Sequence, residues 1–215
     1  MRARQLRIAG LFWQAVLAAA FTLLFVTVWS GLLRAEEPRR RSAAELMDIL
    51  MWNREPVGGA FELSDHTGRI RRDTDFRGKL LLVYFGFSYC PDICPTDLQE
   101  ISRAVDQLGP DGEAIQPLFI TLDPERDTAE HLSTYVSLFH PRLVGLTGSA
   151  EAVRQAADAY KVFYERVETG KDEYTVDHSA YVYVMDRAGQ YLGFFPPNTP
   201  AERMLTVIRP HLQAK

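Results

Sequence analysis

Both cysteines of the chain lie close together, four positions apart, in the stretch SYCPDICPTDLQE at residues 88–100. Thiolates at such a spacing bind a soft metal ion or exchange with a disulfide, and both kinds of chemistry require a lowered thiol pKa. Cys90 and Cys94 follow the apolar run LLLVYFGF (80–87) and precede a helical pattern, so they lie at a helix N-terminus, which favours thiolates. The proline after each cysteine predicts a loop across the pair and a helix that begins at about Pro95.

The residues alone leave more than one use of the pair open. Two thiolates bound to one metal ion at about 2.3 Å would stand about 4 Å apart, and a five-residue loop reaches that distance. A disulfide between Cys90 and Cys94 in an oxidised form is also within reach, because the prolines free the pair from rigid helical geometry. A purely stabilising disulfide is disfavoured, because closing so short a loop removes little chain entropy.

A metal ion held by two thiolates would take a third ligand, and the histidines are the candidates. His178 in VDHSAYVYVMD stands directly before a β-prone run, which places it in a loop that feeds a core strand. Asp177 beside it is placed to orient the ring, although spacing does not show whether the ring lies near the cysteines. The other histidines are expected to be surface or capping residues: His66, His131, His140 and His211.

The elements that must position these residues alternate along the chain. Continuous apolar runs predict buried strands at 80–87 and 117–122, with a short strand at 143–146. Apolar residues at helical spacing, together with capping signals, predict helices at 42–52, 96–108, 127–139, 149–160 and 200–211. A short apolar stretch followed by turn-forming residues predicts a hairpin at 61–69. Alternation of apolar and polar residues predicts antiparallel strands at 161–167, 179–186 and 190–195. This order predicts one three-layer α/β domain, a mixed sheet flanked by helices.

The N-terminal segment predicts attachment to a membrane. From Ile8 to Leu33 there are 26 residues without a charge. This segment exceeds the roughly 20 residues that span a bilayer and is longer than the apolar region of a cleaved signal peptide. We therefore expect one uncleaved transmembrane helix within a membrane anchor at 1–34. A juxtamembrane linker with a short helix at 35–56 and a globular domain at 57–215 are expected to follow.

Charge is distributed unevenly along the chain. Residues 1–41 carry a net charge of +5, and residues 42–215 carry a net charge of −9. An acidic domain is a poor partner for nucleic acid and suits cations or basic protein surfaces, although ordinary solubility explains the same charge. Arginines lie on both sides of the apolar segment, so the positive-inside rule does not decide its orientation.

Several separated segments resemble the Sco/SenC family of membrane-anchored copper proteins, whose signature is a Cys-x-x-x-Cys-Pro loop and a distant Asp-His-Ser. The resemblance extends from about Val57 to Phe195. It is carried, in order, by GGAFELSDHTGR, DFRGKLLLVYFGFSYCPDICPTDL, PLFITLDPERDT, FHPRLVGLTG and VDHSAYVYVMD. Agreement across ordered segments is far more specific than the cysteine pair alone.

The resemblance implies a thioredoxin-like fold and a copper site made by Cys90, Cys94 and His178. Two thiolates and an imidazole form a soft, low-coordinate set that suits Cu(I), whereas zinc would usually take a fourth donor. The sequence does not decide between Cu(I) and Cu(II). Asp123 in LDPERD matches a family motif near the end of the second buried strand. We expect it either near the site, where it would assist transfer, or as a turn or cap residue.

The resemblance also implies a task and a location. The task is delivery of copper to the CuA centre of cytochrome c oxidase subunit II, with other periplasmic copper carriers as further partners. The location is a single span in a bacterial plasma membrane, with the C-terminal domain in the periplasm. A mitochondrial inner membrane is less favoured, because the few residues before the apolar segment leave little room for a transit peptide.

Two other functions would use the same cysteines. A thiol–disulfide reductase would keep the CuA cysteines of subunit II, or those of another exported client, reduced. The usual oxidoreductase loop has two residues between its cysteines, so the three in this chain favour metal without excluding exchange. A thiol peroxidase is disfavoured, because such enzymes usually have threonine three residues before the reactive cysteine, where this chain has Phe87.

Overall fold

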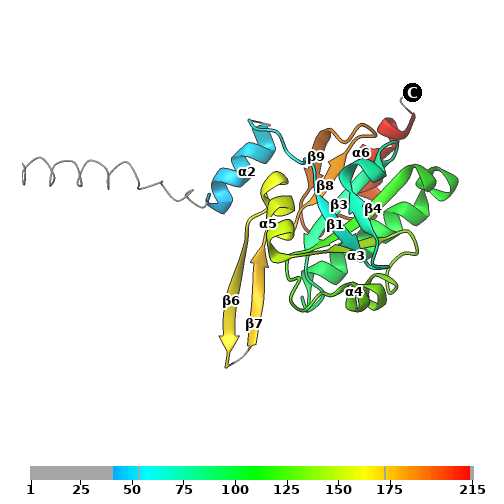
Figure 1. Cartoon of the computed structure of the whole chain (residues 1–215). Helices are drawn as coiled ribbons and strands as arrows, with labels where there is room; N and C mark the ends of the chain where they lie inside the picture. Colours follow the sequence, from blue (N-terminus) through cyan, green and yellow to red (C-terminus); the bar gives the residue numbers. More distant parts are fainter. Residues whose placement is uncertain (1–40, 53, 172, 214–215) are drawn as a thin grey trace, which may run out of the picture. The chain divides into compact units, whose positions relative to one another are not determined.

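The computed structural model describes residues 41–52, 54–171 and 173–213 (Figure 1). The apolar segment at 8–33, for which we predict a transmembrane helix, lies outside these residues. None of the helices in the described part of the chain combines the length and the apolar character that a bilayer span requires. The N-terminal anchor therefore stays a prediction.

A seven-stranded mixed sheet lies at the centre, with the strand order β2-β1-β5-β4-β3-β8-β9. Its strands are β1 (Glu62–Asp65), β2 (Ile70–Arg72), β3 (Leu80–Gly86), β4 (Ile115–Thr121), β5 (Val144–Thr147), β8 (Val182–Met185) and β9 (Tyr191–Phe195). β3, β4 and β5 are parallel, and the other strands join antiparallel. Every residue of β3 is buried, as expected for a central strand covered on both faces.

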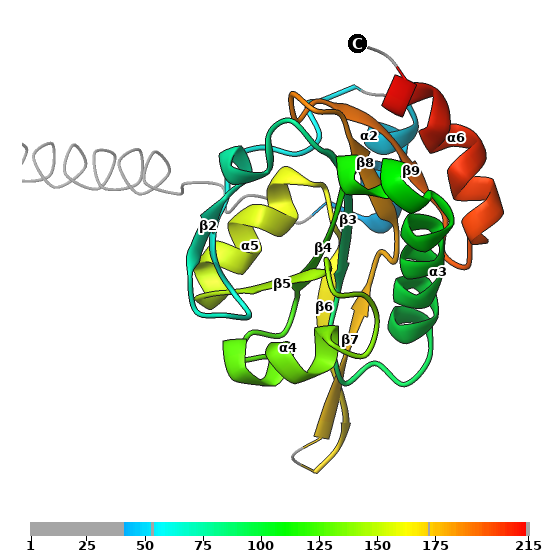
Figure 2. The ribbon, with the colours of Figure 1, turned by 90° about the vertical axis from the view of Figure 1, so that its right-hand side faces the viewer.

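Helices cover both faces of this sheet. They are α2 (Ala43–Trp52), α3 (Ile93–Gln107), α4 (Ala129–Val136), α5 (Ala150–Ala159) and α6 (Ala201–Gln213), with 3-10 turns η1 (Asp73–Phe76) and η2 (Gly109–Ala114). Figure 2 shows α3 and α6 side by side, across the sheet from α5. The rings of Tyr84 and Phe119 lie on the α4 face, whereas Phe85 contacts Tyr160 at the end of α5. The predicted arrangement of a mixed sheet between helices is confirmed.

A separate two-stranded sheet, the β6–β7 hairpin, was predicted only in part. β6 (Tyr164–Gly170) overlaps the strand predicted at 161–167 and extends three residues beyond it, but β7 (Glu173–His178) was not predicted. His178 is therefore the last residue of a strand rather than part of a loop. Figure 1 shows the hairpin extending away from the central sheet. The alternation of larger side chains in EYTVDH, which begins three residues after Gly170, was the available signal for β7.

Two predicted helix starts were also displaced. α3 begins at Ile93 rather than Pro95, so Cys94 lies in its first turn. Proline is tolerated there, because the N–H groups of the first turn have no acceptor within the helix. α4 is capped by Thr128, whose hydroxyl accepts a hydrogen bond from the backbone N–H of His131, and not by Asp127. The carboxylate of Asp127 is instead used in a buried network described below.

α2, which we assigned to a juxtamembrane linker, packs into the core of the described domain. Its predicted capping box is present, since Ser42 and Glu45 each accept a hydrogen bond from the other's backbone N–H. Leu46, Ile49 and Leu50 are buried within the main hydrophobic cluster. The compact unit that contains the sheet accordingly begins at Arg41.

We expect Leu50→Ala to lower the free energy of unfolding by about 2–5 kcal/mol, because it removes a buried side chain and leaves a cavity. The neighbouring side chain of Met51 is 61% exposed, so Met51→Ala is a matched control that should change stability by less than about 0.5 kcal/mol. Urea unfolding of the soluble domain measures both. Equal stability of the two variants would show that α2 does not belong to the cooperative core.

Candidate metal centre

The site lies where two parallel strands end. Gly86 at the end of β3 pairs with Thr121 at the end of β4, and the backbone N–H of Leu122 donates to the carbonyl of Gly86 at 2.7 Å. The cysteine loop (residues 87–92) follows β3, and the segment LDPERD (122–127) follows β4. The carboxyl ends of parallel strands are where α/β proteins gather ligands, so both motifs meet at this edge.

The two cysteines occupy different environments within this edge. Cys94 is buried in the first turn of α3, whereas Cys90 is half-buried in the loop before it. Both thiols are free. Room for the sulfur of Cys94 comes from Gly86, because a Cβ atom at that position would lie 2.8 Å from Sγ. A glycine at the end of β3 is therefore part of how the sequence places this thiol.

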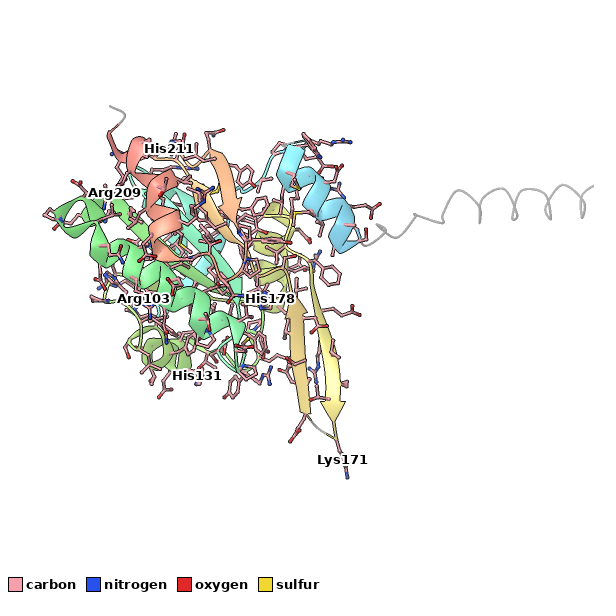
Figure 3. The ribbon with its side chains drawn as sticks, turned by 180° about the vertical axis from the view of Figure 1, so that it is seen from behind. Arg103, His131, Lys171, His178, Arg209 and His211 are labelled. Carbon is pink, nitrogen blue, oxygen red and sulfur yellow. The ribbon has the colours of Figure 1, made fainter. Side chains whose placement is uncertain are left out.

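His178 reaches the same place from β7. Its Nε2 lies 3.5 Å from Sγ of Cys94, and its ring stands edge-on to the rings of Phe87 and Tyr84. In Figure 3, His178 lies where the hairpin meets the rest of the domain, while Lys171 lies at the far tip. The imidazole and the thiol that we predicted to meet are thus brought together across 84 positions of sequence.

Hydrogen bonds shift the pKa values of the two thiols in opposite directions. The hydrogen bond from Cys94, assisted by one from His178 and by the N–H groups of Asp92 and Cys94, holds the pKa of Cys90 well below its ordinary range. The same hydrogen bond to Cys90, together with burial, raises the pKa of Cys94. At neutral pH Cys90 is therefore the thiolate, and it is also the more exposed of the two.

The donor atoms fit a soft metal ion in part. Two donors bound at about 2.0–2.3 Å to one ion lie roughly 3.5 Å apart, which matches the separation of Cys94 Sγ and His178 Nε2. The pKa of Cys90 is lowered chiefly by Cys94 and further by His178, which places its sulfur near both side chains. Within the described residues, however, no group of three or more His, Cys, Asp or Glu side chains is arranged to hold a metal ion.

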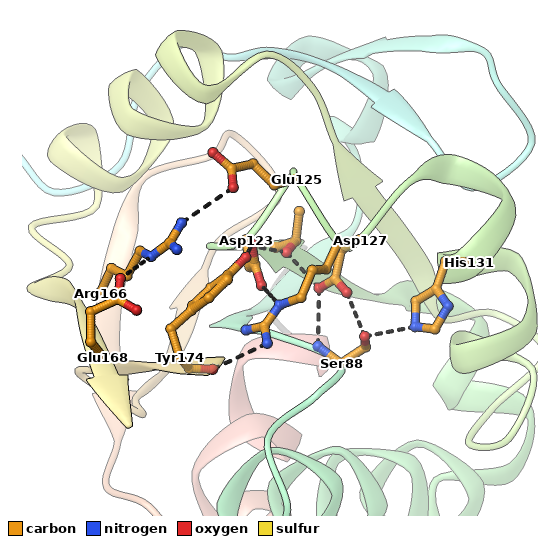
Figure 4. A network of polar contacts seen from close by, with 10 residues as sticks. Ser88, Asp123, Glu125, Asp127, His131, Arg166, Glu168 and Tyr174 are labelled. Atoms are coloured by element: carbon orange, nitrogen blue, oxygen red, sulfur yellow. Dashed lines mark hydrogen bonds and ion pairs between the residues drawn. The ribbon is translucent and has the colours of Figure 1, made fainter. Parts of the chain in front are cut away.

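The carboxylates that we proposed as supporting residues have other surroundings: Asp177 is exposed, and Asp123 binds other side chains. Asp177 is exposed and precedes His178 on a strand, so the two side chains point to opposite faces. The Nδ1 atom of His178 is buried and has no hydrogen-bond partner among the described residues. Asp123 is buried and binds Arg126 in an ion pair, and the hydroxyl of Tyr174 donates to it at 2.9 Å (Figure 4). The proposed roles of both aspartates stay predictions.

Asp127 anchors the cysteine loop, a role that no local sequence pattern indicates. Its fully buried carboxylate accepts hydrogen bonds from the backbone N–H of Ser88 at 3.0 Å, from the Ser88 hydroxyl, and from Thr121 at 2.6 Å (Figure 4). His131 contacts the same Ser88 hydroxyl at 2.8 Å and stacks on Tyr89. These contacts fix the start of the loop relative to β4 and α4.

The remaining histidines bear out the expected surface and capping roles only in part. His140 accepts a hydrogen bond through Nδ1 from the backbone N–H of Arg142, two residues on, as a capping residue does, although it is buried. His66 accepts through Nδ1 from the backbone N–H of Gly145 in β5, so it connects to a strand and caps no helix. His211 is exposed near the end of α6. His131 was expected to be a surface residue of a helix, but it lies against the cysteine loop. Its helical spacing gave no sign of that contact.

Comparison with known proteins identifies close relatives of this chain. The SCO1/SenC family model matches residues 51–213. The bovine mitochondrial SCO2 homologue is 42% identical over 186 residues, which cover 85% of this chain and 69% of the relative. The copper-bound structure of Bradyrhizobium japonicum ScoI superposes with a TM-score of 0.68 at 36% identity, covering 72% of this chain and 99% of that one. Copper-bound yeast Sco1 gives 0.69 at 36% identity, with coverages of 75% and 91%. The thioredoxin-like fold is confirmed.

We expect Gly86→Ala to lower the free energy of unfolding by about 1–3 kcal/mol, because the added methyl group overlaps the sulfur of Cys94. Displacement of that sulfur should also raise the rate at which Cys94 reacts with a thiol reagent. Gly59→Ala is the control, since its added methyl group meets only Ala159 at 3.6 Å. Unchanged stability and reactivity in Gly86→Ala would contradict the close packing at this position.

We expect iodoacetamide to alkylate Cys90 at pH 6, because its depressed pKa keeps it a thiolate there. Cys94→Ala removes the main hydrogen bond to this thiolate, so the pKa of Cys90 should rise and the rate at pH 6 should fall at least about tenfold. Mass spectrometry of alkylated peptides across a pH series measures both. If the alkylation rate of Cys90 in the wild-type chain instead inflects between pH 8 and 9, the assigned difference between the two thiol pKa values is wrong.

Proposed function

The chain belongs to the SCO1/SenC family, and from that premise we propose that it binds copper and delivers it during cytochrome c oxidase assembly. The proposed recipient is the CuA centre of subunit II. Copper is the cargo in this proposal, and Cys90, Cys94 and His178 are its ligands. The observation that carries the proposal is the 3.5 Å approach of His178 Nε2 to Cys94 Sγ, beside a second thiol.

The chemistry of the donor set supports this choice of metal. Two sulfur donors and one imidazole form a soft set with a low coordination number, which suits Cu(I) better than zinc or hard cations. Solved Sco structures that resemble this chain at 36% identity hold copper. The rings of Phe87 and Tyr84 around the imidazole supply an apolar wall that limits access of water to a bound ion.

The different exposures of the two thiols support an order of events in delivery. Cys90 is half-buried and Cys94 is buried, so a ligand from a client protein approaches the Cys90 side of the site first. Exchange would begin with a client thiolate replacing Cys90, while Cys94 and His178 still hold the ion. Copper changes partners in this scheme without a change in oxidation state.

We further propose that the segment at 8–33 anchors the domain to a membrane and that residues 42–215 work on the periplasmic side of a bacterial plasma membrane. The 26 uncharged residues support the span. Relatives of the chain include both mitochondrial and bacterial Sco proteins. Subunit II and other copper carriers in that compartment are the proposed partners.

Thiol–disulfide reduction is the second candidate, and the unequal thiols favour it. A thiolate that is partly exposed, next to a buried thiol, is the arrangement that attacks a disulfide. Cys90 would attack the client disulfide and release one client thiolate, and Cys94 would then displace the second. The client gains two electrons and becomes a dithiol, while Cys90 and Cys94 become a disulfide.

We expect residues 42–215 to bind one Cu(I) per chain, and Cys90→Ser, Cys94→Ser and His178→Ala each to weaken binding at least about tenfold through loss of a ligand. Metal analysis after dialysis against a Cu(I) chelator measures retention. His66→Ala, which changes a histidine outside the site, is the control and should retain copper fully. Full retention by His178→Ala would remove the imidazole from the ligand set.

The oxidation state of the client's cysteines distinguishes copper delivery from disulfide reduction. With a subunit II CuA domain whose cysteines are already reduced, we expect the copper-loaded chain to transfer Cu(I) to the client, and the purple colour of the CuA centre should appear when ferricyanide is then added as a one-electron oxidant. With a client whose cysteines are oxidised, reductase activity predicts that the copper-free reduced chain generates client thiols. If the chain generates thiols in the oxidised client but transfers no copper to the reduced client, the delivery proposal is wrong and the chain acts as a reductase.

A further inference from the structure

Arg126 connects the LDPERD segment, to which it belongs, with two segments that are far from it in the sequence. Its Nε pairs with the buried carboxylate of Asp123 on the LDPERD segment. Its guanidinium stacks on Tyr174 of β7 with 3.7 Å between Cζ and the ring centroid, and its Nη1 donates to the Tyr174 carbonyl at 3.1 Å. The same group faces the ring of Tyr89 in the cysteine loop at 4.8 Å. One side chain therefore contacts the LDPERD segment, β7 and the cysteine loop.

The β6–β7 hairpin depends on such a connection. It forms a two-stranded sheet of its own, and an isolated two-stranded hairpin is at best marginally stable in water. Its β6 strand is exposed along almost its whole length. Tyr174 lies four residues before His178 on β7, so whatever holds Tyr174 against the domain also limits where the imidazole can lie.

Arg126 is also linked to the imidazole through an aromatic ring. Its Cζ lies 5.8 Å from the ring centroid of Phe87, and that ring lies 6.0 Å from the ring of His178, edge-on. Phe87 stands directly after β3, and its carbonyl accepts a hydrogen bond from the Cys90 N–H. Arg126 thus contacts the strand that carries the imidazole and the residue against which the imidazole packs.

We propose that Arg126 is a positioning residue for His178: by holding Tyr174 and Phe87 together, it keeps the imidazole at Cys94. Asp123 acts through it, because its carboxylate binds the guanidinium and the Tyr174 hydroxyl at once (Figure 4). Neither residue touches the metal in this proposal. The proposal rests on the proposed copper function only where copper binding is measured. The effect that it predicts on the copper-free protein does not depend on that function.

Arg166 provides a matched control on the other side of the same tyrosine. Its Cζ lies 3.6 Å from the Tyr174 ring centroid, so it makes a similar stacking contact. It belongs to β6 itself, its side chain is 50% exposed, and its ion pairs with Glu125 and Glu168 involve exposed carboxylates. Exposed pairs of this kind contribute little, so Arg166→Gln should leave the imidazole in place.

The first test uses the copper-free domain. We expect Arg126→Gln to abolish the nuclear Overhauser contacts between the rings of His178 and Phe87 and to raise amide exchange in β7 at least about tenfold. Tyr174→Leu should do the same, which provides a second variant if one of the two folds poorly. Arg166→Gln should keep wild-type values. Retained ring contacts in both Arg126→Gln and Tyr174→Leu would overturn the proposal, whether or not the chain binds copper.

The second test asks whether Arg126 acts on copper through the imidazole. We expect Arg126→Gln to weaken Cu(I) binding by about 10–100-fold, as losses of supporting residues around a metal ligand usually do. In the His178→Ala background the same change should weaken binding less than twofold, because the imidazole is already gone. Equal losses in both backgrounds, or no loss in either, would overturn the proposal. A wild-type chain that does not bind copper would instead refute the proposed function and leave the copper-free test to decide.

Discussion

The site depends on one contact, the approach of an imidazole from β7 to a buried thiol at the start of α3. Several independent features are needed to allow it. Gly86 leaves room for the sulfur, the early start of α3 brings Cys94 inward, and the hairpin returns His178 to the edge where β3 and β4 end. The parallel register of β3 and β4 provides that common edge, so the central sheet determines where all three meet.

Sequence patterns predicted the elements of this site better than its contacts. The buried strands at 80–87 and 117–122 were predictable because a strand covered on both faces is apolar throughout. The cysteine pair and His178 were recognised from residue type and from family resemblance. β7 was missed because its six residues include charged and polar ones, which resemble a loop. Its pairing with β6 depends on a partner that local periodicity does not reveal.

Asp127 and Arg126 show a second reason why sequence patterns did not predict every contact of the site. An aspartate before a helix predicts a cap, and a charged residue in a turn predicts exposure. Tertiary partners override both expectations here: Asp127 is fully buried against Ser88 and Thr121, and Arg126 is covered by aromatic rings. Burial of a charge is stabilised by partners that are distant in sequence, so no local pattern predicts it.

The donor atoms are divided between two sheets of one compact unit. Both sulfurs belong to the central domain, whereas the nitrogen belongs to the small β6–β7 sheet. The separation of nitrogen and sulfur is therefore determined by how one sheet packs against the other, and not by the register of a single continuous sheet. A small change in the position of the hairpin alters that separation while the central sheet keeps its own pairing.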